Sequence, residues 1–400
     1  MNAHLDDAIV LAATLIVGAI LFLPRLRHAR SWTATVTPLA SIIGSGFLVL
    51  APLLDKRFGV AAAPVMLALC AVAYLFGGAI RHNIAHSDGS ERLPPAVVGL
   101  ERMASIALAF AYVVSVTYYL NLFGSFGVAL TPFDEPVYGR ALATLALAFI
   151  ALFGAWQGLS GLEGLETWVV SLKLAIIAGL LAGLGVYFAE KALDSALLHP
   201  PVSETGWPAV TLAFGMLITV QGFETSRYLG SEYSAEERIR SMRHAQWLAT
   251  AIYIVYVGLS SFVFDPATIE TRETAVIDMS RAIASVLPVL LVAAALAAQF
   301  SAAVADTVGC GGMTEDATGH RIPESWAYIG VAASGIALTW ATDIFEIIAL
   351  ASRAFALYYA LQCAIAVRFA WQAGRRPKAL WFAALGALAV LAVCFGRAVE

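Results

Sequence analysis

Charged residues are scarce in this chain: only 13% of its 400 residues are Asp, Glu, Lys or Arg, whereas 60% are hydrophobic. So small a share of charge, together with a mean hydropathy of +0.79, excludes an ordinary soluble domain. No basic tract interleaved with aromatic residues occurs, so nucleic-acid binding has no support. Cysteine is also rare, and the four that occur have no metal-ligand spacing: Cys70, Cys310, Cys363 and Cys394. We therefore expect no disulfide framework, no metal site and no cofactor.

Long apolar segments are abundant instead, and most are about 20 residues long, the length that crosses a hydrocarbon core of about 30 Å. They lie at about 8–23, 32–54, 60–81, 96–130, 138–156, 162–188, 208–230, 245–264, 282–309, 326–341, 345–369 and 379–396. We predict an all-α membrane protein with about twelve transmembrane helices. Asp6 and Asp7, rather than a basic region, precede the first segment, so we interpret it as a retained helix and not as a signal peptide.

Two of these segments are interrupted by glycine. The segment at 32–54 holds Ser41-Ile42-Ile43-Gly44-Ser45-Gly46-Phe47 in its middle, and the segment at 208–230 holds Thr219-Val220-Gln221-Gly222-Phe223-Glu224-Thr225. Glycine costs roughly 1 kcal/mol relative to alanine inside a helix, so we predict that both helices are broken. In a bilayer, opened backbone is tolerated where it lines a cavity or meets a ligand. The alternative is a patch of small residues against which another helix packs closely.

The distance in sequence between a helix of the second half and its counterpart in the first half is nearly the same for every pair. This regular spacing predicts two repeats of five helices. An odd number of helices turns the second repeat over, so the repeats are expected to be inverted. We predict an extra helix and basic loop at 1–31, repeats at 32–190 and 205–370, and a last helix at 371–400. Interrupted helices at matching positions of inverted repeats indicate a transporter binding site between them.

The distribution of Lys and Arg predicts the orientation, because cytoplasmic loops carry more of them. If the loop with Arg25, Arg27 and Arg30 is cytoplasmic, that side also holds Arg81, Arg92, Arg102, Arg238, Arg240, Arg243, Arg321, Arg368, Arg375, Arg376 and Lys378. The other side holds Lys56, Arg57, Arg140, Lys191, Arg272, Arg281 and Arg397. These 14 residues against 7 predict that both termini are external, in a multi-pass protein of a bacterial inner (plasma) membrane.

Short stretches around the interruptions carry a resemblance to a known family. Ile43-Gly44-Ser45-Gly46 is followed by an aromatic residue and by Pro52, and Gly222-Phe223-Glu224 is followed by Glu232 and a charged loop. These stretches resemble the two broken helices of the amino acid–polyamine–organocation (APC) transporters, and 170–174 resembles the fifth core helix. The resemblance covers roughly residues 32–370 and implies a leucine-transporter-like fold. Phe47 directly after Gly46, and the extra helix at the amino terminus, depart from the family's usual pattern.

The two interruptions predict a site for a zwitterion. Backbone N–H groups of Gly44, Ser45 and Gly46 at a helix start favour a carboxylate, and freed carbonyls at 220–222 suit an ammonium. The candidate substrate-binding residues are Ser41, Ile43, Gly44, Ser45, Gly46, Tyr118, Val220, Gln221, Gly222 and Phe223. The alternative for Tyr118 is packing. We expect a bulky residue such as leucine at Gly44 or Gly46 to abolish substrate binding while leaving expression and folding largely intact.

Five charged residues lie at membrane depth, where charge is costly and indicates function. Lys173, Asp306 and Glu224 are candidates for proton coupling, with Asp306 the expected partner of Lys173. The family resemblance implies that a lysine on this helix replaces a sodium ion, so we expect a proton rather than sodium. Arg227 and Arg353 are candidates for gates, since arginine keeps its proton and can only clamp or pair.

We therefore predict a secondary transporter of an amino acid or amine, coupled to protons, embedded in the lipid bilayer and without enzymatic activity. A sodium-coupled or uncoupled carrier of an amine or organic ion is the alternative, and a membrane sensor or an embedded enzyme is a further one. Gly158-Leu159-Ser160-Gly161 has the look of an intramembrane serine protease motif. Such an enzyme needs a base near its serine, and every histidine falls in or next to a predicted loop.

Overall fold

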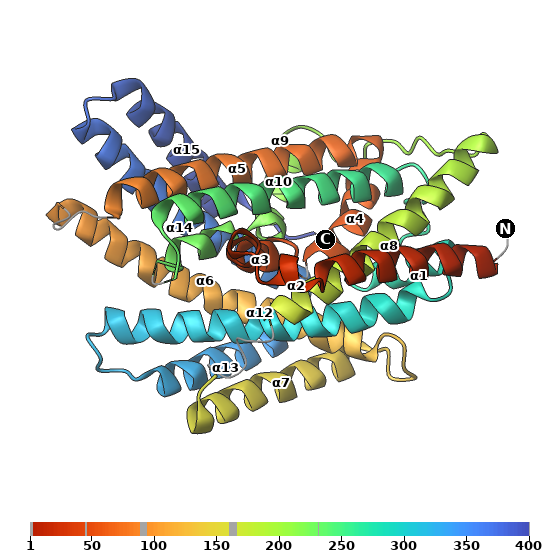
Figure 1. Cartoon of the computed structure of the whole chain (residues 1–400), viewed down its shortest axis with the longest axis horizontal. Coiled ribbons are helices and arrows are strands. Elements are labelled where there is room, and N and C mark those ends of the chain that lie inside the picture. Colours follow the sequence, from red (N-terminus) through yellow and green to blue (C-terminus); the bar gives the residue numbers. More distant parts are fainter. Residues whose placement is uncertain (1–2, 45, 89–93, 160–165, 231, 400) are drawn as a thin grey trace.

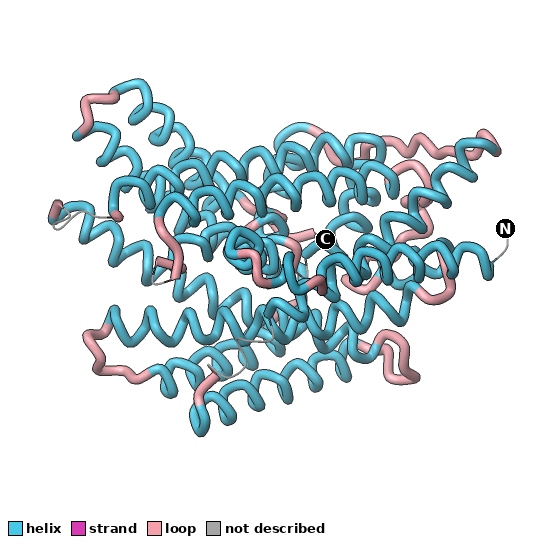
Figure 2. Tube along the Cα trace, viewed as in Figure 1, coloured by secondary structure: helices cyan, strands magenta, loops and turns pink. Residues whose placement is uncertain are grey.

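The computed structural model of the chain describes residues 3–44, 46–88, 94–159, 166–230 and 232–399, and within these ranges every regular element is helical (Figure 2). The first part holds α1 (Ala3–Leu21), α2 (Pro24–Arg27), α3 (Arg30–Ile42), α4 (Gly46–Phe58), η1 (Gly59–Ala61), α5 (Ala62–Ser87), α6 (Pro95–Val128), α7 (Pro136–Gln157) and α8 (Glu166–Leu193). The second holds α9 (Gly206–Gly215), η3 (Leu217–Val220), η4 (Phe223–Tyr228), α10 (Ala235–Ser260), α11 (Ala275–Ile283), α12 (Leu287–Ala317), α13 (Glu324–Ala341), α14 (Ile344–Gln372) and α15 (Arg376–Phe395). The predicted all-α fold is confirmed.

Every apolar segment expected from the sequence contains a helix, but twelve uninterrupted membrane spans are not established. Eight helices in the described ranges are long and apolar enough to cross a membrane. The first halves of the two broken segments are too short, since α3 has 13 residues and α9 has 10, whereas α4 is counted together with α5 as one span, Gly46–Ser87. The first half of α10 is rich in charged and polar residues, so this helix is not among the eight. Arg238, Arg240 and Arg243, expected in a loop, lie in the first turns of α10.

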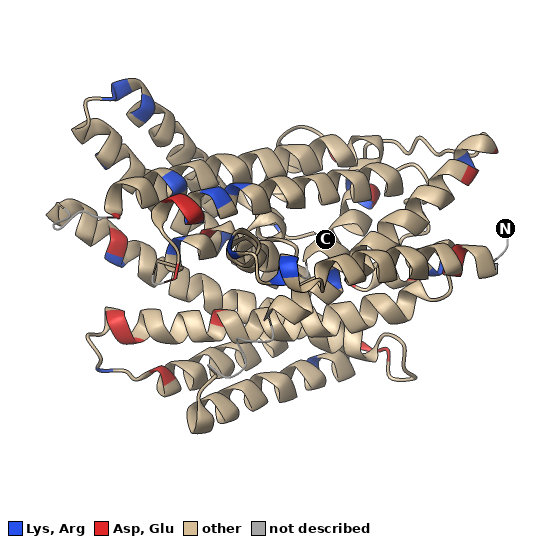
Figure 3. Cartoon of the chain, viewed as in Figure 1, with Lys and Arg blue, Asp and Glu red and all other residues tan. Residues whose placement is uncertain are grey.

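The long helices pack side by side along the longest axis of the molecule (Figure 1). α6 and α12 pack closely together, α14 packs on α6 and α15, and α5 packs on α10. The extra helix α1 packs on α8, at the edge of the bundle. The ribbons of these helices are largely tan in Figure 3, because most of their charged residues lie near the helix ends. The division into two repeats remains a prediction.

The start of α3 is joined to the start of α10 at the predicted cytoplasmic side. Ser234 and Glu237 form a capping box at the amino terminus of α10, in which each side chain accepts a hydrogen bond from the other residue's backbone N–H. Arg30 Nε donates to Glu237 Oε1 at 2.6 Å. This hydrogen bond, with those from Ser234, lowers the pKa of Glu237 to about 2. The pair therefore stays charged at any physiological pH.

The residues after α15 form a short strap, residues 396–399, that lies against α9. The backbone N–H of Arg397 donates to the carbonyl of Thr211 at 3.1 Å, and a Cβ on Gly215 would lie 1.8 Å from the carbonyl oxygen of Arg397. Val399 is only 7% exposed. Arg397 also pairs with Glu204 at 3.0 Å, just before α9 begins. This C-terminal strap therefore ties the first half of the second broken helix to the end of α15.

Candidate functional site

The first break lies between α3, which ends at Ile42, and α4, which begins at Gly46. Ile43 still donates its N–H to the carbonyl of Leu39 at 3.0 Å, so the helix opens only after it. Gly44 lies in the break and Ser45, a predicted site residue, falls outside the described ranges. The predicted interruption of this helix is therefore present, at the position of the paired glycines.

The second break opens in two steps. α9 ends at Gly215, and Ser352 on α14 closes this end: its Oγ donates to the carbonyl of Gly215 at 2.7 Å and accepts from the N–H of Ile218 at 2.9 Å. The chain then turns at Gly222, whose φ of 113° is a conformation that glycine adopts without the strain a side chain would bring. Glu224 Oε2 accepts from the N–H of Gly222 at 3.0 Å, so a side chain replaces a missing helical hydrogen bond.

The two breaks pack directly against each other. A Cβ on Gly46 would lie 2.9 Å from Cα of Thr219, and one on Gly222 would lie 2.5 Å from Cβ of Ser41. Each glycine thus touches the opposite break. The expectation that a bulky residue at Gly46 leaves the fold intact is therefore wrong, because the space beside it is filled by the backbone of the other broken helix.

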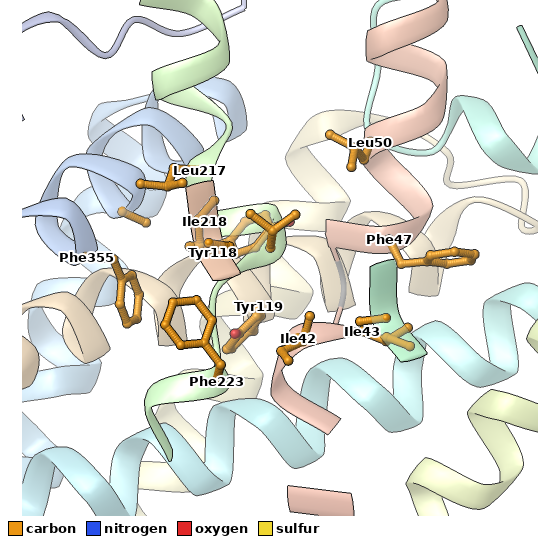
Figure 4. Close-up of a cluster of buried hydrophobic side chains, with 14 of the residues drawn as sticks. Ile42, Ile43, Phe47, Leu50, Tyr118, Tyr119, Leu217, Ile218, Phe223 and Phe355 are labelled. Carbon is orange, nitrogen blue, oxygen red and sulfur yellow. The ribbon is translucent and has the colours of Figure 1, made fainter. Parts of the chain in front are cut away.

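Tyr253 on α10 holds both breaks through one hydroxyl group. Its Oη lies 2.9 Å from the carbonyl oxygen of Ile42 and 2.6 Å from that of Thr219, and its side chain is buried. Both carbonyls are at the points where the helices open. Figure 4 shows the buried side chains of the two breaks, among them Ile42, Ile43 and Ile218, facing one another in one cluster.

Lys173 on α8 is 6% exposed and its Nζ donates to the carbonyl of Ala40 at 2.9 Å, near the end of α3. Asp306 on α12, its expected partner, accepts a hydrogen bond from Ser115 on α6 instead. The ammonium thus binds the broken helix itself, while the carboxylate faces α6.

Glu224 and Asp306 bring two carboxyl groups to the side of the second break. Glu224 is fully buried, and its Oε2 accepts a hydrogen bond from the hydroxyl of Tyr359 at 3.0 Å. Neither carboxyl group takes part in any ion pair among the described residues. Gln221 in the break donates from Nε2 to Tyr119 Oη at 3.1 Å. The structure therefore gathers acidic groups and tyrosine hydroxyls here.

The aromatic candidates lie next to the second break. The rings of Tyr118 and Tyr119 are 5.4 Å apart, and the ring of Phe223 stacks on Tyr359 at 5.2 Å. Val220 is buried in η3. These side chains fill the space around the break, so a substrate could reach it only after the helices separate.

The cavities at the first break are small. One, beside Gly44 and Phe47, has a volume of about 10 Å³, and one beside Ser41 and Ser301 has a volume of about 20 Å³. Lys173 lines both. Such volumes hold about one water molecule each. The structure is closed around this part of the site.

The two gate candidates have different surroundings. Arg227 in η4 forms an ion pair with Glu101 on α6, and its carbonyl accepts from Arg238 at 2.7 Å. Arg353 on α14 donates from Nε to the carbonyl of Val393 near the end of α15 at 2.7 Å. Arg227 thus links a broken helix to its neighbour, whereas Arg353 binds α15.

Four residues with important contacts were not predicted from the sequence. Tyr253, Ser352 and Ser115 are ordinary residues of membrane helices, and only their contacts reveal them. Asp55 is fully buried and accepts from Ser261 Oγ at 2.8 Å. It follows directly after the predicted end of the 32–54 segment and precedes Lys56 and Arg57, so the local pattern indicated a loop position and not a buried carboxyl group.

Fold and site together define a class: a polytopic helical membrane protein with two broken helices whose openings meet in the interior. A family model described as "APC superfamily transporter" matches residues 24–396. The chain belongs to the APC superfamily and is a transporter. A protein of Aquifex aeolicus (strain VF5), named only "Uncharacterized protein", is 41% identical over 404 residues, which cover 99% of this chain and 98% of that one.

Proposed function

We propose that the protein is a proton-coupled secondary transporter of a small amino-acid-like solute, working by alternating access in a bacterial inner membrane. The observation that carries the proposal is the burial of three ionisable side chains beside the breaks: Lys173, Glu224 and Asp306. Charged groups at membrane depth are costly and belong to ion and proton pathways. The family also supports a non-enzymatic function.

The charges around the breaks support a substrate with both an anionic and a cationic group. The start of α4 at Gly46 presents the positive end of a helix dipole, which favours a carboxylate. Glu224 and Asp306 favour an ammonium on the other side. Because the breaks touch through Gly46 and Gly222, binding requires the two broken helices to separate first.

Lys173 supports the proton as the coupling ion. Its ammonium already supplies a positive charge to the carbonyl of Ala40 at the end of α3. Lysine is a cation whose proton a protein can remove, whereas arginine keeps its proton. When the broken helices move, this contact breaks, and the proton can leave toward the opposite side of the membrane.

The test is uptake into proteoliposomes under an imposed pH gradient and, separately, an imposed sodium gradient. The wild-type protein should concentrate substrate on the pH gradient alone. Lys173→Ala should lose this accumulation while still exchanging substrate across the membrane. Lys191→Ala, at the end of the same helix, is the matched control and should behave like wild type. Accumulation driven by sodium alone, or by a pH gradient in Lys173→Ala, would contradict proton coupling through this residue.

A carrier of an amine that lacks a carboxylate is the second candidate. It is favoured by the two buried carboxyl groups, which form no ion pair with any residue that the structure describes, and by the tyrosines around them, since aromatic faces attract cations. A thermal-shift comparison of each amino acid with its matched decarboxylated amine separates the two, because specific binding stabilises the folded protein. Stabilisation by the amine alone would favour this candidate.

A further inference from the structure

The side chain of Gln299 places a primary amide in the interior of α12, the helix that packs closely on α6. Gln299 is fully buried, at 0% exposure. Neither its Nε2 nor its Oε1 has a hydrogen-bond partner in the part of the chain that the structure describes. A buried amide without partners is costly, because it has given up its hydrogen bonds to water. Such a group therefore calls for a functional explanation.

Gln299 lies at the depth of the first break. Ala298, the residue before it, lines both of the small cavities there, one beside Gly44 and the other beside Ser41. From this alanine, one cavity extends along α12 toward the start of the helix and the other toward its end. The amide is therefore level with the opened backbone between α3 and α4.

Gln299 also lies on the side of α12 that faces α6. Seven residues of an α-helix are nearly two turns, so Gln299 and Asp306 point in directions about 20° apart. Asp306 accepts a hydrogen bond from Ser115 on α6. One turn further along α12, Cys310 Sγ donates to the carbonyl of Ala109 at 3.4 Å, so the two helices run antiparallel. Gln299 lies about 10 Å from Asp306 toward the start of α12.

Tyr119 on α6 lies beside both breaks (Figure 4). It lies four residues beyond Ser115, or about 6 Å along α6 in the direction of Gln299. Its hydroxyl accepts from Gln221 Nε2 in the second break at 3.1 Å. A Cβ on Gly44 in the first break would lie 3.9 Å from its ring. Gln299 is therefore at the place along α12 where both breaks meet α6.

We propose that Gln299 is a specificity-determining residue whose amide binds a primary carboxamide in the side chain of the substrate, an amino acid of the asparagine or glutamine type. This inference rests on the proposed function and adds the class of substrate. A carboxamide matches both atoms of the Gln299 amide, since its carbonyl oxygen accepts from Nε2 while its NH₂ group donates to Oε1.

Other side chains match this amide less well. A carboxylate lacks the donor that Gln299 Oε1 needs, and a hydroxyl group offers a single oxygen to two atoms. An apolar side chain of similar length leaves both atoms unpaired. A site built to hydrogen-bond a substrate group rejects analogues that lack it, because its own buried polar atoms are then left without partners.

The experiment measures the unfolding temperature of the purified protein in detergent with six amino acids: asparagine and glutamine, their carboxylate counterparts aspartate and glutamate, and the apolar leucine and methionine. In wild type, asparagine or glutamine should raise the midpoint more than its counterparts do, because specific binding stabilises the folded protein. Gln299→Met should lose this preference. The control Gln362→Met changes a glutamine of α14 that is also buried and should keep it.

The stability of the protein without ligand tests the unpaired amide separately. Gln299→Met removes two buried polar atoms without partners, so its midpoint should equal or exceed that of wild type. Gln362 Oε1 accepts from Asn83 Nδ2 at 2.8 Å, so Gln362→Met should lower the midpoint. A fall as large in Gln299→Met would overturn the proposal, since it would show that the protein itself satisfies this amide.

The remaining outcomes separate this inference from the proposed function. If wild type shows no preference for a carboxamide, or if Gln299→Met keeps the wild-type preference, the inference is wrong, whereas a substrate among the six amino acids still stands. If none of the six raises the midpoint of wild type, the amino-acid substrate and this inference fail together. None of these readouts depends on proton coupling.

Discussion

At the scale of single residues, Tyr253 has the most consequential contacts, because one hydroxyl serves a carbonyl from each break. We expect Tyr253→Phe to remove the single O–H donor that these two buried carbonyls share, at a cost of about 1–3 kcal/mol. The unfolding temperature in detergent should fall accordingly. The measurement is thermal unfolding followed by a thiol-reactive dye.

The same helix supplies the control for this prediction. Tyr256 lies three residues further along α10, is also buried, and its hydroxyl has no hydrogen-bond partner in the described ranges. Tyr256→Phe should therefore be neutral or slightly stabilising, since it removes a buried polar atom without a partner. Equal destabilisation by both variants would mean that the loss at Tyr253 does not come from its hydrogen bonds.

Residues of the site differ in how far the sequence could predict them. Lys173 and Glu224 stand out because a charge within an apolar segment is rare whatever surrounds it. Tyr253 and Ser352 do not, since tyrosine and serine are common in membrane helices. Their importance comes from contacts with residues 34 and more than 130 positions away in the chain, which no local pattern encodes.

At the scale of elements, the glycines of the breaks allow the two broken helices to pack in direct contact. Gly222→Ala would place a methyl group 2.5 Å from Cβ of Ser41 and force a side chain into a positive φ. We expect a loss of folded protein, measured as the monodisperse fraction in size-exclusion chromatography. Gly330→Ala is the control, because nothing lies within 4 Å of that position in the interior of α13.

The control should gain stability, by roughly 1 kcal/mol, because alanine is the better helix former. If Gly222→Ala instead gave as much folded protein as Gly330→Ala, the breaks would not be in contact as described. The positions of both breaks were predictable, since Gly44 and Gly46 in one apolar segment and Gly222 beside Glu224 in the other are conspicuous. Their mutual contact was not, because it joins residues about 180 positions apart.

The ion pair between Arg227 in η4 and Glu101 on α6 predicts a second effect at this scale. Both side chains are largely buried, at 10% and 23% exposure, so removing one charge leaves the other poorly compensated. In a cysteine-free background with Ser226→Cys, a buried position beside the pair, Arg227→Gln should speed thiol labelling from the cytoplasmic side several-fold.

The double variant Glu101→Gln/Arg227→Gln should label more slowly than Arg227→Gln, because no uncompensated charge remains. Arg240→Gln removes an exposed pair and should leave the labelling rate unchanged. If the Arg227→Gln variant were labelled as slowly as the protein that carries Ser226→Cys alone, the ion pair between Arg227 and Glu101 would not keep the cytoplasmic side closed.

At the scale of the whole molecule, the distribution of Lys and Arg predicts the orientation. Leu5 and Arg240 are both exposed, near the amino terminus and in the first turns of α10. In a cysteine-free background, Leu5→Cys and Arg240→Cys should react with membrane-impermeant thiol reagents from opposite sides. Reaction from the same side would contradict the number of membrane crossings between them. The apolar segments made the helical fold predictable, whereas α1's place beside α8 depends on distant contacts.

The C-terminal strap has a practical consequence for handling the protein. Its backbone lies so close to Gly215 that even a methyl group has no room there, and Val399 behind it is buried. An affinity tag fused after this segment would have to pull Val399 out of its packing to become accessible to a resin. The amino-terminal helix α1 is mostly exposed on its surface, so a purification handle placed before it avoids that disturbance.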